Sequence, residues 1–183
     1  MGDSQAKYLD VFPAWLRSLG DDAENLGKLL SSTQLAEGAR QALAGGVNYL
    51  FKSLDLVPDG IDDIGYLDDA FVLRIAADHA IAEDVSKLPP EQLRSLNRLA
   101  EEADTVKEFL AGQYPRLDAY VRGLRKTAAR GRSVQDILHN DAVRTSFLSD
   151  LRGFSQAYEA PSFSREEKNL VKLRAFFDAK LPR

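Results

Sequence analysis

The stretch that decides the fold runs from Asn48 to Ala70 and reads NYLFKSLDLVPDGIDDIGYLDDA. Six of its residues are aspartates, at positions 55, 59, 62, 63, 68 and 69. Turn-forming residues (Pro58, Gly60 and Gly65) and aliphatic side chains stand between them. A solvated loop does not need so many aliphatic side chains, and a buried loop disfavours so many charges. The stretch therefore predicts an ordered, partly buried connection between two helices, with its carboxylates held in place.

The segment before this stretch predicts a long helix. Thr33 is expected to be its N-cap, and apolar residues at helical spacing continue to about Ser53, with Leu54 completing the apolar face. Gly45 and Gly46 lie inside this helix, where each glycine costs about 1 kcal/mol relative to alanine. We therefore expect another helix to approach closely at these two glycines.

The segment after the stretch predicts the central helix of the molecule. Residues from about 68 to 84 are apolar on nearly every side, which is typical of a helix surrounded by other helices. Its charged exceptions, Arg74 and Asp78, lie four residues apart and are expected to pair with each other. Asp68 and Asp69 stand at its start, where an aspartate caps a helix and its charge suits the helix dipole.

Apolar residues recur at helical spacing through the remainder of the chain as well. Near the N-terminus we expect two short helices, one restarting at Pro13 and ending at Gly20, the other covering about 23–30. Pro89 and Pro90 break the helical pattern, and further helices are expected after them, over residues 91–110 and 117–130. Two more are expected nearer the C-terminus, one capped by Ser133 and a last one with a capping box at Ser164 and Glu167. No segment alternates convincingly with period two. The sequence thus predicts an all-α fold, a compact bundle of about seven or eight helices.

Parts of the opening stretch resemble, in order and spacing, the signature of the YkvA-like bacterial domain of unknown function. The matching parts are Tyr49-Leu50, the run Asp55 to Asp59 and the run Gly65 to Asp69. The resemblance covers less than a third of the chain, and it implies a small helical domain without an established activity. Ser53 and Asp62 stand where that family has prolines, which implies a less rigid first turn and a more acidic loop.

Length and composition are those of one globular domain, with 183 residues of which 44% are hydrophobic. We expect a single helical domain over residues 1–183. Within it, residues 33–84 would form the YkvA-like core, and residues 91–183 a helical extension packed on that core.

The absence of cysteine excludes disulfides and thiolate metal sites, and only two histidines are present. A metal ion would therefore be a hard cation bound by oxygen. We find no secretion signal and no transmembrane segment, since no apolar run approaches the roughly 20 residues of a membrane span. These features predict a soluble, cytoplasmic protein. Its net charge of −4 is uneven, because the first 100 residues hold 9 Lys and Arg against 16 Asp and Glu.

The aspartates suggest a divalent-cation site, because clustered carboxylates repel one another and a hard cation relieves that repulsion. The predicted ligands are Asp55 and Asp59 from the connection and Asp68 and Asp69 from the helix, holding Mg²⁺ or Ca²⁺. The spacing does not fit an EF-hand, since the third and twelfth positions counted from Asp55 are valine and tyrosine. The alternative is structural, with the same carboxylates capping helices or pairing with arginines.

A basic stripe is predicted on the helix over residues 117–130, where Arg122, Lys126 and Arg130 are spaced four residues apart. Such a stripe could bind phosphate, RNA or an anionic membrane surface. The chain as a whole is acidic, with a pI near 5.3, whereas nucleic-acid-binding domains tend to be basic. We therefore expect a solvated helix face and no strong nucleic-acid binding.

Two functions of different classes follow from these features. One is a non-enzymatic helical interaction or scaffold domain with a protein partner, and with peripheral membrane contact allowed. The other is a divalent-metal-binding module or metal-dependent hydrolase that uses the aspartate cluster. The sequence has no glycine-rich phosphate loop, no G-x-S-x-G and no H-E-x-x-H, so no catalytic residue is assigned.

Overall fold

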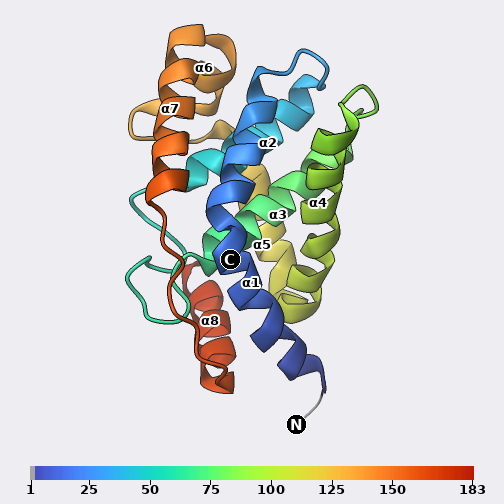
Figure 1. The fold of residues 1–183 in the computed structure, drawn as a ribbon. Coiled ribbons are helices and arrows are strands. Elements are labelled where there is room, and N and C mark those ends of the chain that lie inside the picture. The colour runs from blue at the N-terminus through green and yellow to red at the C-terminus, as the bar shows by residue number, and fades with distance from the viewer. Residues whose placement is uncertain (1–2) are drawn as a thin grey trace.

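The computed structural model describes residues 3–183, which form eight α-helices and one short β-hairpin (Figure 1). The α-helices are α1 (Asp3–Lys28), α2 (Glu37–Tyr49), α3 (Leu67–Ile81), α4 (Pro90–Leu110), α5 (Tyr114–Gly123), α6 (Val134–His139), α7 (Asp141–Ala157) and α8 (Glu167–Lys180). The 3₁₀ turns are η1 (Leu29–Ser31), η2 (Ala111–Gln113) and η3 (Leu124–Lys126), and the paired strands are β1 (Ala128–Ala129) and β2 (Arg132–Ser133). The predicted all-α fold is confirmed. Among the described residues, no helix has both the length and the apolar character to cross a membrane.

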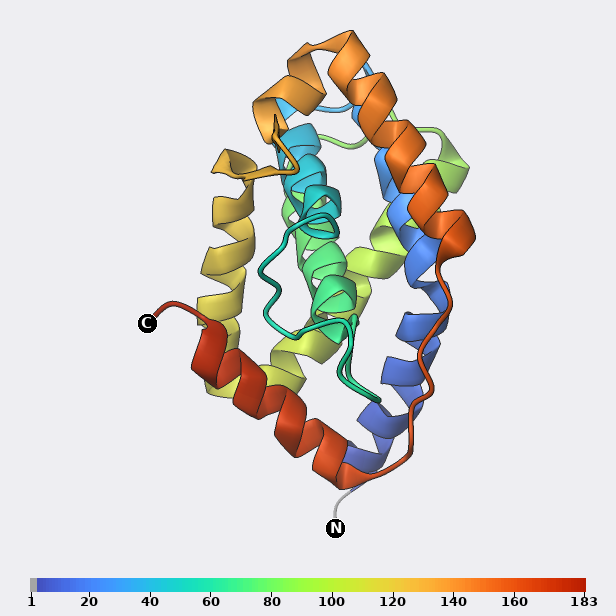
Figure 2. The same ribbon diagram turned by 90° about the vertical axis from the view of Figure 1, so that its left-hand side faces the viewer.

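The predicted central helix is α3. It packs most extensively against α4 and α2 and also contacts α1 and α5, so that these helices enclose it (Figures 1 and 2). Thirteen of its fifteen residues are buried, which explains why it is apolar on nearly every side. Buried apolar side chains from all eight helices join in one continuous core around it.

The two glycines of α2 permit the close packing that the sequence predicts. A Cβ atom at Gly46 would lie 2.6 Å from the Cβ of Ala76 on α3, closer than carbon atoms approach without overlap. A Cβ atom at Gly45 would lie 3.1 Å from the backbone of Leu124 and Arg125 in η3. α2 thus loses helix propensity at two positions and gains contact with two neighbouring elements.

α1 is a single helix that continues through Pro13, so the expectation of two short helices is wrong. An interior proline removes one helical hydrogen bond and typically costs about 3 kcal/mol. Buried side chains lie on one face of α1 on both sides of the proline, among them Phe12, Trp15 and Leu26. Each large apolar side chain contributes about 1.5–3 kcal/mol when fully buried, so this continuous face outweighs the defect.

α2 is shorter than predicted at both ends. Thr33 lies in a turn and is not the N-cap; the helix begins at Glu37 after Ala36, which makes no side-chain cap. The helix ends at Tyr49, so Leu54 falls in the following loop and is 83% exposed instead of completing an apolar face. The apolar pattern continues past the end of α2 because Leu50 and Phe51, in the following loop, also pack on the core. The pattern therefore predicted a longer helix than the structure has.

The predicted basic stripe is wrong because the helix ends before Lys126, the second of its three residues. α5 ends at Gly123, and the chain turns through η3 into the β-hairpin. Arg130 and Gly131 then adopt positive φ values of 49° and 76° at the hairpin turn. Arg122, Lys126 and Arg130 therefore lie on a helix, a 3₁₀ turn and a hairpin in that order, and share no helix face.

One of the two predicted capping boxes is present. The Ser133 hydroxyl accepts the amide of Asp136 at 3.0 Å, and the carboxylate of Asp136 accepts the amide of Ser133, at the start of α6. The box at Ser164 is wrong: α8 begins at Glu167 without a side-chain cap. The backbone of Ser164 is bound elsewhere, because its amide donates to Asp63 in the loop before α3.

Candidate functional site

The stretch between α2 and α3 forms a loop, residues 50–66, that folds back over the first turn of α3 (Figure 2). We call it the aspartate loop. Asp55 and Asp59 lie in it, and Asp68 and Asp69 lie in the first turn of α3. The side chains of the last two are buried, with relative exposures of 0% for Asp68 and 3% for Asp69. These four aspartates, which we call the acidic pocket, are the predicted cation ligands.

Asp68 binds the loop and does not cap its own helix. One carboxylate oxygen, Oδ2, accepts hydrogen bonds from the Tyr49 hydroxyl at 2.5 Å and from the amide of Val57 at 3.0 Å. The Tyr49 hydroxyl in turn accepts the amide of Leu56 at 2.8 Å. The N-cap position belongs to Tyr66, in a left-handed conformation with no side-chain cap. The predicted capping role of Asp68 and Asp69 is therefore wrong, although their charges do lie at the favourable end of the helix dipole.

Tyr49 is the residue in contact with Asp68 that the sequence pattern did not single out. It stands at the end of α2 and is buried, so its hydroxyl must be satisfied within the protein. It joins the end of α2, the loop backbone and the start of α3 through one hydroxyl and one carboxylate. Its place in the motif, at the first tyrosine of the resemblance, was the available signal.

A tight turn brings Asp59 back toward the start of α3. The amide of Ile61 donates to the carbonyl of Pro58, and that of Gly65 donates to the carbonyl of Ile61. Gly65 is required here, because a Cβ atom would lie only 2.2 Å from the carbonyl oxygen of Asp59. The turn thus places Asp59 beside the first turn of α3, although ten residues separate Asp59 from Asp69.

The pKa of each carboxylate in the acidic pocket is raised, and at Asp55, Asp68 and Asp69 the charges of neighbouring aspartates add to the effect of burial. Burial is the first cause at every position, and it raises the pKa of Asp68 to about 6 and that of Asp55 to about 7. The pKa of Asp69 lies well above its usual range because of burial and the charges of Asp68, Asp59 and Asp55. Burial also raises the pKa of Asp59. The structure therefore places the four predicted residues near enough for charge to act among them, but within residues 3–183 no three of them form a group that could hold a metal ion.

Tyrosines line the acidic pocket. Burial and the neighbouring aspartate charges raise the pKa of Tyr49, Tyr66 and Tyr158, and raise that of Tyr120 to about 12. The Tyr120 hydroxyl accepts a hydrogen bond from the ammonium of Lys52 at 3.2 Å. These rings come from the end of α2, the loop, α5 and the chain after α7, and the raised pKa values mean that their hydroxyls keep their protons.

Two buried carboxylate oxygens in the acidic pocket, Asp68 Oδ1 and Asp69 Oδ2, have no partner beyond the neighbouring carboxyl, with which a protonated Asp69 shares a side-chain hydrogen bond. Within residues 3–183, no salt bridge joins any of the four aspartates to a basic side chain. In the same part of the chain, no three acidic or histidine side chains already stand at ion-binding geometry. The pocket therefore offers oxygen donors of the type that hard cations take, but over the described part of the chain they do not form a group that could hold an ion.

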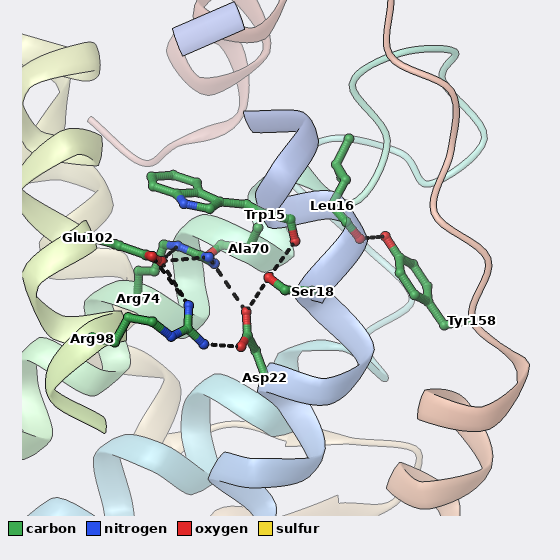
Figure 3. A network of polar contacts seen from close by, with 9 residues as sticks. All are labelled: Trp15, Leu16, Ser18, Asp22, Ala70, Arg74, Arg98, Glu102 and Tyr158. Carbon is green, nitrogen blue, oxygen red and sulfur yellow. Dashed lines mark hydrogen bonds and ion pairs between the residues drawn. The ribbon is translucent and has the colours of Figure 1, made fainter. Parts of the chain in front are cut away.

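Arg74 does not pair with Asp78, contrary to the prediction. Its buried guanidinium lies 2.8 Å from Glu102 on α4 and 3.6 Å from Asp22 on α1, and 4.0 Å over the ring of Trp15 (Figure 3). Arg98 joins the same two carboxylates from the solvent side. This network connects α1, α3 and α4 and fixes the helix that carries the acidic pocket.

The two histidines lie outside the acidic pocket. His79 is buried in the last turn of α3, at the opposite end from Asp68, and its Nε2 lies 2.7 Å from Asp118 on α5. His139 lies 2.9 Å from Glu37 at the surface. Neither contacts the four aspartates, so any cation at the acidic pocket would have oxygen ligands alone.

No family model, no curated protein and no solved structure matches this chain. The resemblance to the YkvA-like signature therefore stays a prediction that rests on the motif residues themselves.

Proposed function

We propose that this protein is a helical domain that binds a divalent cation, Mg²⁺ or Ca²⁺, in the acidic pocket. The observation that carries the proposal is the pair of buried, unpartnered oxygens, Asp68 Oδ1 and Asp69 Oδ2. A buried acceptor without a partner costs about 1–3 kcal/mol, and more when the group is charged. A cation held by Asp68 and Asp69, with Asp55 and Asp59 completing its shell, would supply the missing partner.

Charge repulsion supports the same proposal. Four carboxylates converge, and the basic side chain that offsets their charge is Lys52, which lowers the pKa of Asp55. Without a cation the protein relieves the repulsion by holding protons, as the raised pKa values of the aspartates indicate. A divalent cation relieves it by displacing those protons.

The charge balance favours a binding role over hydrolysis. Four carboxylates and one divalent cation leave a net negative site, which repels the phosphate and carboxylate groups that metal-dependent hydrolases act on. An ion in this position would instead hold the aspartate loop against the first turn of α3. We therefore propose a cation-stabilised interaction or scaffold domain, acting in the cytoplasm on a protein partner.

Thermal unfolding with and without cations tests the proposed function. Wild-type protein in EDTA is compared with the same protein in millimolar Mg²⁺, Ca²⁺ or Mn²⁺. A ligand at 100 times its dissociation constant stabilises the folded state by about 2.7 kcal/mol, which shifts the midpoint of a chain of this size by several degrees. We expect such a shift in wild type and its loss in Asp69→Asn.

The matched control is Asp62→Asn, which changes an aspartate of the same loop outside the proposed ligand set. It should keep the cation-dependent shift. A wild-type midpoint that is equal in EDTA and in all three cations would refute the proposed function.

A further inference from the structure

We propose that the surface around the β-hairpin binds anionic lipid headgroups and docks the protein on a membrane surface. We call this surface the hairpin patch, and it consists of Lys52, Leu54, Arg125, Lys126 and Arg130. The proposal does not depend on a cation in the acidic pocket. It adds a location, the face of a lipid bilayer, to the interaction domain proposed above.

Positive charge is concentrated in one short segment of an acidic protein. Residues 122–132 contain five Lys and Arg and no Asp or Glu, whereas the remaining residues hold 19 of the 24 Lys and Arg and all 28 Asp and Glu. The segment runs through the end of α5, η3 and the hairpin, so its basic residues gather around a turn of the chain. An anionic surface therefore attracts this part of the molecule and repels the remainder, which orients the protein.

Three basic residues of this segment have no carboxylate partner. Within residues 3–183, Arg125, Lys126 and Arg130 form no salt bridge, and the last two are exposed. The two flanking arginines, at positions 122 and 132, each pair with an aspartate. The unpaired residues keep their charge available to an anionic ligand.

The hairpin presents Arg130 at its tip. Ala129 pairs with Arg132, which leaves a turn of two residues, and both have positive φ values, 49° at Arg130 and 76° at Gly131. Such turns favour asparagine and glycine, so an arginine at the first position carries a backbone cost. The Arg130 guanidinium lies 5.0 Å from the centre of the Phe51 ring, which fixes the side chain at the surface of the protein.

The start of the aspartate loop adds an apolar residue to the same surface. Leu54 is 83% exposed and follows Phe51, the residue under Arg130, by three positions. The hairpin and this part of the loop lie on the same side of the bundle (Figures 1 and 2). Cations attract an anionic headgroup layer, and an exposed aliphatic side chain beside them gains by entering the boundary with the acyl chains.

The acidic turn of the aspartate loop lies away from the hairpin. Residues 59–63 form the far end of the loop, where Asp63 accepts the amide of Ser164 in the chain before α8 (Figure 2). Asp55, the residue after Leu54, has its pKa raised to about 7, first by burial, so it is partly neutral near neutral pH. The nearest carboxylates of the loop therefore offset little of the positive charge.

The chemistry of the patch favours a lipid surface over a nucleic acid. Proteins that bind single strands stack exposed aromatic rings on the bases, whereas the Phe51 ring is 7% exposed and is covered by Arg130 and Arg132. The exposed Leu54 matches the apolar layer below the headgroups and has no counterpart on a phosphate backbone.

Flotation of the full chain with vesicles tests the proposal. Vesicles of equal parts phosphatidylcholine and phosphatidylglycerol are compared with vesicles of phosphatidylcholine alone, in EDTA so that divalent cations take no part. We expect binding to the anionic vesicles and none to the others. Binding should be lost as the salt concentration rises from about 0.1 M to about 1 M, because the screening length falls from about 10 Å to about 3 Å.

Substitutions in the patch test which residues bind. Lys126→Gln and Arg130→Gln should each lower partitioning onto anionic vesicles by about fivefold, the factor that one basic residue contributes near such a surface. Lys126→Arg keeps the charge and should bind as wild type. The matched control is Lys87→Gln, an exposed lysine in the loop between α3 and α4, which lies on the opposite side of the bundle (Figure 1). It should also bind as wild type.

Leu54→Trp reports whether position 54 enters the bilayer. Trp15 is the single native tryptophan and is 4% exposed, so a change of emission on adding vesicles comes from position 54. We expect a blue shift with the anionic vesicles and none with phosphatidylcholine alone.

The contrary outcomes are equally specific. Absence of binding to the anionic vesicles at low salt overturns the inference, as does equal binding by wild type, Lys126→Gln and Arg130→Gln or an equal loss in Lys87→Gln. Unchanged emission of vesicle-bound Leu54→Trp overturns the placement of the patch against the bilayer. Binding to single-stranded RNA but not to vesicles would assign the patch to a nucleic acid and overturn the inference too. None of these outcomes bears on cation binding in the acidic pocket.

Discussion

At the scale of single residues, the acidic pocket is an arrangement of carboxylates that bind protons more tightly in the folded chain than in the unfolded chain. The pKa is raised to about 6 for Asp68 and to about 7 for Asp55, in each case first by burial. Unfolded aspartate titrates near about 4. Between these values the two carboxyls hold more protons in the folded state than in the unfolded state, so their contribution to the free energy of unfolding falls as the pH rises.

We therefore predict that the protein in EDTA is progressively destabilised from about pH 4 to about pH 8, as these carboxylates ionise in the folded state. Urea unfolding at a series of pH values measures the effect. In Asp69→Asn the decline should be smaller, because asparagine cannot ionise and because one repelling charge is gone. An equal pH dependence of the free energy of unfolding in wild type and in Asp69→Asn would contradict the raised pKa values.

A second residue-scale prediction concerns Arg74. Its guanidinium is fully buried between Glu102, Asp22 and the ring of Trp15, so Arg74→Ala leaves two carboxylates without their buried partner. Breaking a buried ion pair in this way typically costs about 3–5 kcal/mol. Arg98 contacts the same carboxylates but its side chain is 46% exposed, so Arg98→Ala should cost about 1 kcal/mol or less. Equal losses in urea unfolding would show that burial does not govern this network.

At the scale of elements, the contact between α2 and α3 depends on Gly46. The Cβ atom of Gly46→Ala would overlap Ala76, and overpacking of this kind costs about 1–3 kcal/mol. A Cβ atom at Gly123, the last residue of α5, would meet no other atom within 4 Å, so Gly123→Ala should be neutral or stabilising by up to about 1 kcal/mol. Urea unfolding of both variants checks the contrast, and a stabilising Gly46→Ala would contradict the close approach.

Sequence periodicity predicted the elements whose burial is uniform along their length. α4 agrees with its predicted range to within one residue, and α3 starts as predicted but ends at Ile81, three residues before the predicted end. Periodicity misplaced boundaries where burial continues past a helix end, as at Phe51, or where a proline lies within a buried face, as at Pro13. The apolar periodicity also did not predict that α5 ends at Gly123, before Lys126 and Arg130 of the predicted basic stripe.

The region of the candidate site was predictable, but its contacts were not. The six aspartates and the turn formers among them identified an ordered loop against the start of α3, while the choice of four of them as cation ligands stays a prediction. The hydrogen bonds of Asp68 could not be predicted, because Tyr49 lies 19 residues earlier and reaches it only through tertiary packing. The same holds for Asp63 and Ser164, which are 101 residues apart.

At the scale of the whole molecule, the acidic pocket lies where three parts of the chain meet. The loop after α2, the start of α3 and the chain between α7 and α8 contact one another there (Figure 2). The Arg74 network holds α3 from its other side, through α1 and α4. The junction therefore connects segments from both halves of the sequence.

Calorimetric titration of the full chain with Mg²⁺, Ca²⁺ and Mn²⁺ tests cation binding most directly. Performed in two buffers of different ionisation enthalpy, it measures both the ions bound and the protons released. We predict saturable binding that weakens as the pH falls from about 8 to about 6, with more protons released at the lower pH, because the aspartates must then give up protons to the cation. Absence of saturable binding by all three ions at about pH 8, or binding that Asp68→Asn and Asp69→Asn leave unchanged, would contradict it.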